Sequence, residues 1–189
     1  MAKPQNHETI KALCIKSPYE PSTASSLENY VLTQMTDGKY DFEANKTLLK
    51  YYQCFPEAAN IEVIANALVL SLMRLPNTDF LLLTYLVPAK FSLNPKIKFI
   101  QMCADYLESG RFIQFWESCV DGTVAEITMN ANFRREIRVF MMASIKDTFR
   151  SMDKEQFQLM LGLEPAEFDS FCSQCRDIDK ITSSKVILV

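Results

Sequence analysis

The chain has 189 residues, of which 48% are apolar and 23% charged, and its net charge is −3. This composition excludes an intrinsically disordered chain, and the near balance of charge excludes a protein drawn strongly to polyanions. The longest apolar run, residues 80–87, contains Thr84 and stops at Pro88, so it is too short to span a membrane. Because the first residues are polar and lack a hydrophobic signal core, we expect a cytoplasmic protein without membrane partners, whose six cysteines stay reduced.

The sequence from residue 25 onward carries the apolar period of amphipathic helices. The first 24 residues are more polar and predict a flexible N-terminal segment. Ser25 or Ser26 is a candidate cap for the first helix, and Asn94 precedes a proline at the first position of a later one. With prolines as breakers, the predicted helices span residues 25–36, 41–54, 60–75, 78–87, 95–108, 112–120 and 131–150.

Two similar phrases punctuate this helical region. Gly38 opens GKYDF and Gly110 opens GRFIQF, 72 residues further on. The break at LPNT lies halfway between them, so the chain turns about every 36 residues, a period typical of stacked helix pairs. The sequence therefore predicts a helical-repeat domain of the HEAT or TPR kind over residues 25–150, although two phrases do not name a repeat class.

The pattern changes after Arg150. Two short helices, residues 151–161 and 165–175, precede a polar turn and a β-branched tail at 185–189. The order helix, turn, helix, strand is typical of a winged-helix fold, so we assign residues 151–189 to a second unit. The sequence shows one wing strand, so we expect an incomplete wing whose edge is unpaired or is completed by another chain.

No common catalytic constellation is visible in the sequence. The chain has one histidine, His7, which lies in the predicted flexible segment, and it has no glycine-rich phosphate loop. Cys172 and Cys175 form a C-x-x-C pair without further zinc ligands at a suitable spacing. We interpret the pair as structural, with a redox switch as the alternative, and we predict a non-catalytic protein without cofactors.

RNA binding is the main rival hypothesis, because winged helices often bind nucleic acids. Residues 151–180 contain seven acidic and three basic side chains, which disfavours contact with phosphates there. Arg134, Arg135 and Arg138 lie at helical spacing and are the candidates for a minor RNA contact. Trp116 shares a helix side with Phe112 and Phe115, which favours a core position over an exposed anchor.

Three phrases carry a family resemblance: YDFEAN at residues 40–45, LPNTDF at 75–80 and GRFIQFW at 110–116. In this order and spacing, the chain resembles the subunit K family of eukaryotic translation initiation factor three, from about Ser26 to Val189. The resemblance implies a PCI-type architecture, in which helical repeats precede a winged helix, as in related subunits of the proteasome lid and the signalosome. It also implies contact with subunit L and the PCI-bearing core, and association with the small ribosomal subunit through the complex.

These observations favour a scaffold subunit that acts in translation initiation through protein contacts. A subunit of a sibling PCI complex, an RNA-binding adaptor and a redox-regulated adaptor remain alternatives. The candidate interface residues are apolar side chains in the polar C-terminal unit: Phe168, Phe171, Val186, Ile187 and Leu188.

Overall fold

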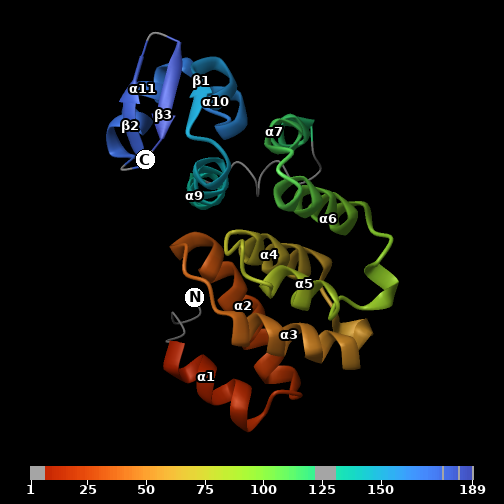
Figure 1. Ribbon diagram of the computed structural model, residues 1–189. Coiled ribbons are helices and arrows are strands. Elements are labelled where there is room, and N and C mark those ends of the chain that lie inside the picture. The colour runs from red at the N-terminus through yellow and green to blue at the C-terminus, as the bar shows by residue number, and fades with distance from the viewer. Residues whose placement is uncertain (1–6, 122–130, 176, 183, 189) are drawn as a thin grey trace.

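The computed structural model describes residues 7–121, 131–175, 177–182 and 184–188, and these are mainly helical (Figure 1). The α-helices are α1 (His7–Lys16), α2 (Pro21–Asp37), α3 (Phe42–Cys54), α4 (Ile61–Leu72), α5 (Asp79–Thr84), α6 (Pro95–Glu108), α7 (Phe112–Asp121), α9 (Ala131–Thr148), α10 (Lys154–Leu161) and α11 (Pro165–Gln174). The remaining elements are the 3-10 turns η1 (Pro56–Ala58) and η2 (Ala89–Phe91) and the strands β1 (Ser151–Asp153), β2 (Ile178–Ile181) and β3 (Lys185–Leu188).

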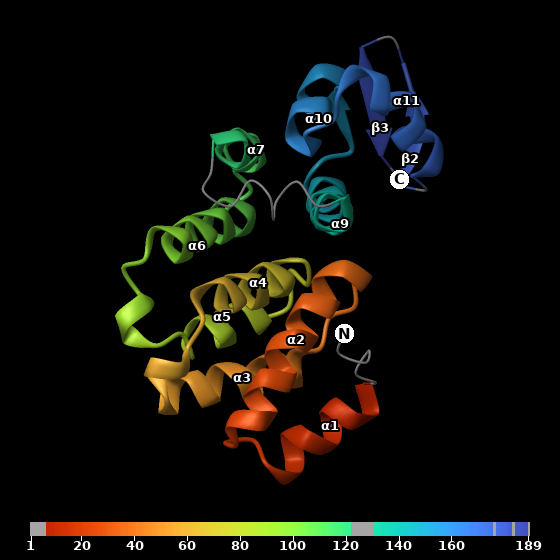
Figure 2. The ribbon, with the colours of Figure 1, turned by 180° about the vertical axis from the view of Figure 1, so that it is seen from behind.

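The helices form a stack that carries a small sheet at its C-terminal end. α1, α2 and α3 pack together at the N-terminal end, and α4 and α5 pack on α2 and α3. In both views, α6 and α9 lie above this layer, and α7 lies beside α10 of the segment made of α10, α11 and the three strands (Figure 2). One continuous apolar core extends from Ile10 to Leu188. The predicted architecture, a helical stack followed by a winged-helix-like segment, is confirmed.

Side-chain caps set several helix boundaries where the sequence predicts them. The Asp41 carboxylate accepts a hydrogen bond of 3.1 Å from the backbone N–H of Ala44 at the start of α3. Asn60 and Asn94 cap α4 and α6 in the same way, with acceptor distances of 3.0 and 2.9 Å. Each cap satisfies a backbone donor that the first helical turn leaves without a partner. The residue types that can do this are few, which is why these helix starts can be predicted from the sequence.

The prediction of a flexible segment over the first 24 residues is wrong for the part that the structure describes. α1 begins at His7, and its Ile10 is fully buried against the stack. α2 begins at Pro21, so Ser25 and Ser26 lie inside the helix and donate hydrogen bonds back to carbonyls one turn earlier. Residues 1–6 lie outside the described residues.

The C-terminal sheet is antiparallel, with strand order β1-β3-β2. β3 lies in the middle: Val186 is opposite Met152 of β1 on one side and Ile181 of β2 on the other. The helix predicted to begin at residue 151 begins three residues later, at Lys154, because residues 151–153 form β1. The polar stretch at 178–181, expected to be a turn, is a strand.

The expectation of an unpaired edge on the tail is also wrong. Both edges of β3 are hydrogen-bonded to neighbouring strands of the same chain, so this strand needs no partner from another protein. The outer edges of the described sheet belong to β1 and β2. Residue 189, the last of the predicted strand, lies outside the described residues.

Candidate protein interface

The YDFEAN phrase closes the corner between α2 and α3. The side-chain amides of Gln34 and Asn45, both buried, bond to each other in both directions, at 2.8 and 3.1 Å. The side-chain oxygen of Gln34, which accepts from Asn45, also accepts a hydrogen bond of 2.8 Å from the backbone N–H of Asp41. Because each buried amide has its partner, this corner tolerates two polar side chains inside an apolar core.

The start of the same phrase lies near the LPNTDF phrase. The guanidinium of Arg74 lies 5.6 Å from the centre of the Tyr40 ring. Burial, and after it the charge of the neighbouring Asp79 carboxylate, raise the pKa of Tyr40 well above its ordinary value. The first two phrases therefore join α3 to the turn between α4 and α5, and their role in the described structure is packing.

The third phrase, GRFIQFW, places aromatic rings between α7 and α9. Phe112 meets Phe140 edge-on with ring centres 6.3 Å apart, and the centres of Phe115 and Phe133 are 6.4 Å apart. Phe112 and Phe115 are buried, as the helical spacing predicts. Trp116 is half-buried, and its indole N–H donates to the carbonyl of Met160 at 3.1 Å, which ties α7 to α10.

Arg138 completes this contact from α9. Its guanidinium donates to the carbonyls of Leu161 and Gly162 at 3.0 and 2.6 Å and pairs with the Glu167 carboxylate at 3.0 Å. It also lies 5.8 Å from the centre of the Trp116 ring. We call Trp116, Arg138 and Gly162 the junction, because together they join the helical stack to the C-terminal segment.

Three of the five predicted interface residues belong to the core of the C-terminal segment. Phe168 is 1% exposed and Val186 is 0% exposed, and Leu188 is also buried. The prediction is wrong for these three, because a small module must bury its few large apolar side chains to fold. Phe171 and Ile187 are partly exposed, and for them an interface role stays a prediction.

The arginines proposed for RNA contact do not form a free cationic stripe. Arg138 is engaged in the junction, and Arg135 forms an ion pair of 2.9 Å with the neighbouring Glu136. Arg134 is half-buried. Since phosphate binding relies on cations that neutralise the backbone, this arrangement gives the RNA hypothesis little support.

Cys172 lies in the last turn of α11 and Cys175 directly follows the helix, and both cysteines are free thiols. Burial, and then the nearby Cys175, raise the pKa of Cys172 to about 11. A thiol with a raised pKa is a poor nucleophile and metal ligand at neutral pH. Within the described ranges, no group of three or more histidine, cysteine or acidic side chains is arranged to hold a metal ion.

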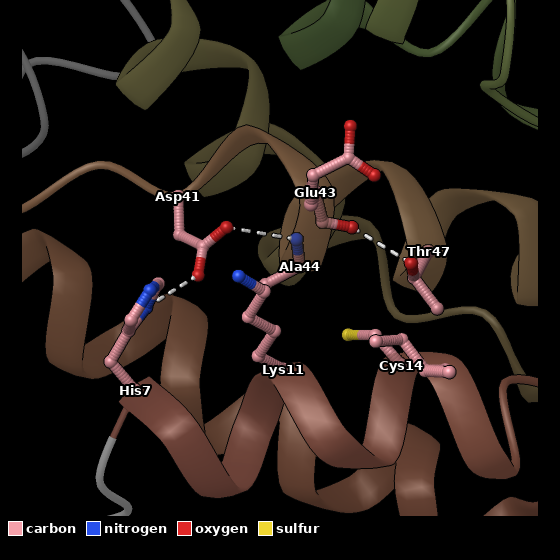
Figure 3. A pocket seen from close by; sticks show the side chains of 8 residues that line it. His7, Lys11, Cys14, Asp41, Glu43, Ala44 and Thr47 are labelled. Carbon is pink, nitrogen blue, oxygen red and sulfur yellow. Dashed lines mark hydrogen bonds and ion pairs between the residues drawn. The ribbon is translucent and has the colours of Figure 1, made fainter.

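A pocket of about 310 Å³ lies between α1 and α3, and its lining includes His7, Cys14 and Asp41 (Figure 3). The expectation that His7 belongs to a flexible segment is wrong, since its ring pairs with Asp41 at 3.0 Å. Cys14 lies two turns from His7 on the same helix, and Figure 3 shows its sulfur near Thr47 instead. Burial raises the pKa of the Cys14 thiol, so the pocket does not pair a thiolate with a base.

The exposed side of α9 is a feature that the sequence analysis missed. Val139 is 61% exposed, although its neighbours in the pattern, Ile137 and Met141, are buried. A helical wheel of residues 131–148 places Val139 opposite Ile137 and Met141, which is the signal that was available. Of the helices that the structure describes, none combines the length and apolar character of a membrane-spanning segment.

Comparison with known proteins identifies the family. A model of the CSN8/PSMD8/EIF3K family matches residues 58–176 of this chain. The chain belongs to this family. It is similar to eukaryotic translation initiation factor 3 subunit K of Drosophila erecta, with 32% identity over 172 residues that cover 87% of this chain and 74% of the relative.

Two further relatives carry the same name. Eukaryotic translation initiation factor 3 subunit K of Culex quinquefasciatus is 36% identical over 145 residues, or 76% of this chain and 65% of the relative. The subunit K of Xenopus laevis is 32% identical over 144 residues, or 76% of this chain and 66% of the relative. The predicted resemblance to subunit K is confirmed.

Proposed function

We propose that this chain is a non-catalytic subunit of eukaryotic translation initiation factor three, which acts in translation initiation through protein contacts. The similarity to proteins named as subunit K over most of the chain carries this proposal. The arrangement of the described residues agrees with it, because the polar groups singled out in the sequence are used for packing inside the chain. The three phrases of the resemblance join helices to one another.

The mechanism is geometric. The junction fixes the C-terminal segment on the end of the helical stack through one guanidinium, one indole and the backbone of one turn. A subunit built in this way presents two surfaces at a set angle, so that partners bound to each surface are held relative to one another. The division into a helical-repeat domain at 25–150 and a winged-helix unit at 151–189 remains part of this proposal.

The proposed partners are subunit L and the PCI-bearing core of the factor, with the small ribosomal subunit reached through the complex in the cytoplasm. Phe171 and Ile187 are the remaining predicted contacts on the C-terminal segment. Direct binding of RNA by this chain is expected to be weak or absent, since Arg135 and Arg138 already pair with carboxylates.

Affinity purification of the tagged chain from its own cells, followed by mass spectrometry, tests the proposal. We expect initiation factor three subunits in stoichiometric amounts, together with the small ribosomal subunit at low salt. Recovery of proteasome-lid or signalosome subunits instead would assign the chain to a sibling complex. The name of the family spans these possibilities, so the experiment decides between them.

A further inference from the structure

The exposed side of α9 is shaped like a docking surface. Four residues one turn apart, Arg135, Val139, Ala143 and Asp147, are all exposed and form a continuous row along the helix, which we call the α9 ridge. A groove of about 430 Å³ runs along one side, between α9 and the turn at residues 73–77. A second groove of about 300 Å³ runs along the other side, between α9 and the end of α11.

Val139 lines both grooves and separates them. The apolar lining includes Leu75 and Phe140 in the first groove and Met142 and Phe171 in the second, and the first groove is also lined by Arg74 and Glu136. Two grooves on either side of a row spaced at every fourth residue are the surface that a second helix fits, ridge into groove. An extended strand would instead need an exposed edge of backbone donors and acceptors, which a helix does not offer.

The charges on the ridge define the occupant further. The centre, Val139 and Ala143, is uncharged, while Arg135 stands at the N-terminal end and Asp147 at the C-terminal end. The charges that line the second groove are compensated within the chain: Arg135 pairs with Glu136, Arg138 with Glu167, and Asp177 with Lys146. A polyanion would meet no uncompensated cation in the second groove, whereas an amphipathic helix with an apolar centre and a basic residue near the Asp147 end would match the ridge.

We propose that the α9 ridge docks an amphipathic helix of another initiation factor three subunit, with its apolar face on Val139 and Ala143 and a basic residue facing Asp147. The proposal rests on the proposed function and names a contact for it. Phe171, predicted from the sequence as an interface residue, lines the second groove and would contact the docked helix.

The test compares Val139→Arg with the matched control Leu159→Arg, on α10. The two side chains are 61% and 59% exposed, so both variants are expected to fold, which thermal unfolding by circular dichroism verifies. Each tagged variant competes with wild type for incorporation into the factor. We expect Val139→Arg to reduce its share about tenfold, because an apolar contact is replaced by a charge, and Leu159→Arg to compete equally.

A photo-crosslinker in place of Ala143 identifies the occupant. A crosslink to a helix of another subunit of the factor supports the proposal. A crosslink to ribosomal RNA, a crosslink to a second copy of this chain, or equal incorporation of Val139→Arg and wild type overturns it. If wild type itself fails to co-purify with the factor, the proposed function is overturned as well, so the two failures are distinguishable.

Discussion

Gly162 meets two constraints that alanine would violate. Its φ is +57°, in the left-handed region, and an added Cβ would lie 2.6 Å from the Trp116 ring. We expect Gly162→Ala to cost about 1–2 kcal/mol for the backbone and about 1–3 kcal/mol more for displacing the ring. Urea unfolding followed by the fluorescence of Trp116 measures this.

The matched control is Gly110→Ala. Gly110 also has a positive φ, +71°, but an added Cβ meets nothing within 4 Å. Only the backbone cost of about 1–2 kcal/mol is expected there. Equal losses for the two variants would mean that the contact between Gly162 and Trp116 contributes nothing.

Arg138 is expected to act through the junction and not through its charge alone. Arg138→Met removes the donors for the Leu161 and Gly162 carbonyls, and we expect a loss of about 1–3 kcal/mol in the free energy of unfolding. Arg135→Met, on the same helix, removes only a surface ion pair and should change stability by less than about 0.5 kcal/mol. Chemical denaturation of both variants at one salt concentration separates the two roles, and similar values would contradict the junction.

At the scale of elements, the corner between α2 and α3 depends on a buried polar pair. Asn45→Ala leaves the buried side-chain NH2 group of Gln34 without its acceptor, and we expect a cost of about 1–3 kcal/mol. Asn29→Ala is the control, since the Asn29 side chain is on the exposed side of α2 and donates only to a carbonyl one turn earlier. Thermal melts compare the two, and an Asn45→Ala variant as stable as the control would refute the role of the pair.

The central strand of the sheet offers a second test of this kind. Val186→Ala should destabilise the C-terminal segment by about 1–3 kcal/mol, because the side chain is fully buried between two strands. Ile187→Ala, on the opposite face, should cost less, since Ile187 is partly exposed. Amide hydrogen exchange of β3 reports the loss directly. Strong protection in both variants would show that Val186 is not a core residue.

Local signals made most helices predictable. Asp41, Asn60 and Asn94 cap helices by bonding to residues two or three positions further on, so these helix starts can be predicted without knowledge of the tertiary structure. α1 was missed because its anchors, Ile10 in the core and His7 on Asp41, act across the chain. β1 and β2 were missed because strands of three and four residues are too short to show alternation.

The candidate interface was predicted less well than the fold. Phe168 and Val186 are apolar residues in a polar neighbourhood, a pattern shared by interface anchors and by the core of a small unit. Arg138 lies on the arginine stripe that the sequence shows, but its partners are carbonyls 23 and 24 residues away. The spacing of residues along one helix does not reveal such contacts with distant parts of the chain.

At the scale of the whole molecule, buried tyrosines link stability to alkaline pH. Burial, and then the hydrogen bond to Glu28, raise the pKa of Tyr52 above its ordinary value. The folded chain thus holds this proton more tightly than the unfolded chain, and Tyr40 behaves in the same way. Stability from this source is complete below about pH 10 and is lost as the pH rises above it.

We therefore expect the free energy of unfolding to fall steeply above about pH 10, and Tyr52→Phe to flatten this fall. Tyr85→Phe is the control, because Tyr85 is an exposed side chain on the surface of the stack. Urea titrations at a series of alkaline pH values measure the profiles. An unchanged slope for Tyr52→Phe would exclude Tyr52 as a source of the pH dependence.

α9 holds the C-terminal segment at two points, through Arg138 near its middle and through the ion pair of Lys146 with Asp177 near its end. Cutting the polypeptide at residue 150 would remove both anchors from the terminal fragment. A fragment designed for separate expression should therefore keep α9 with the sheet, even though the helix also belongs to the stack.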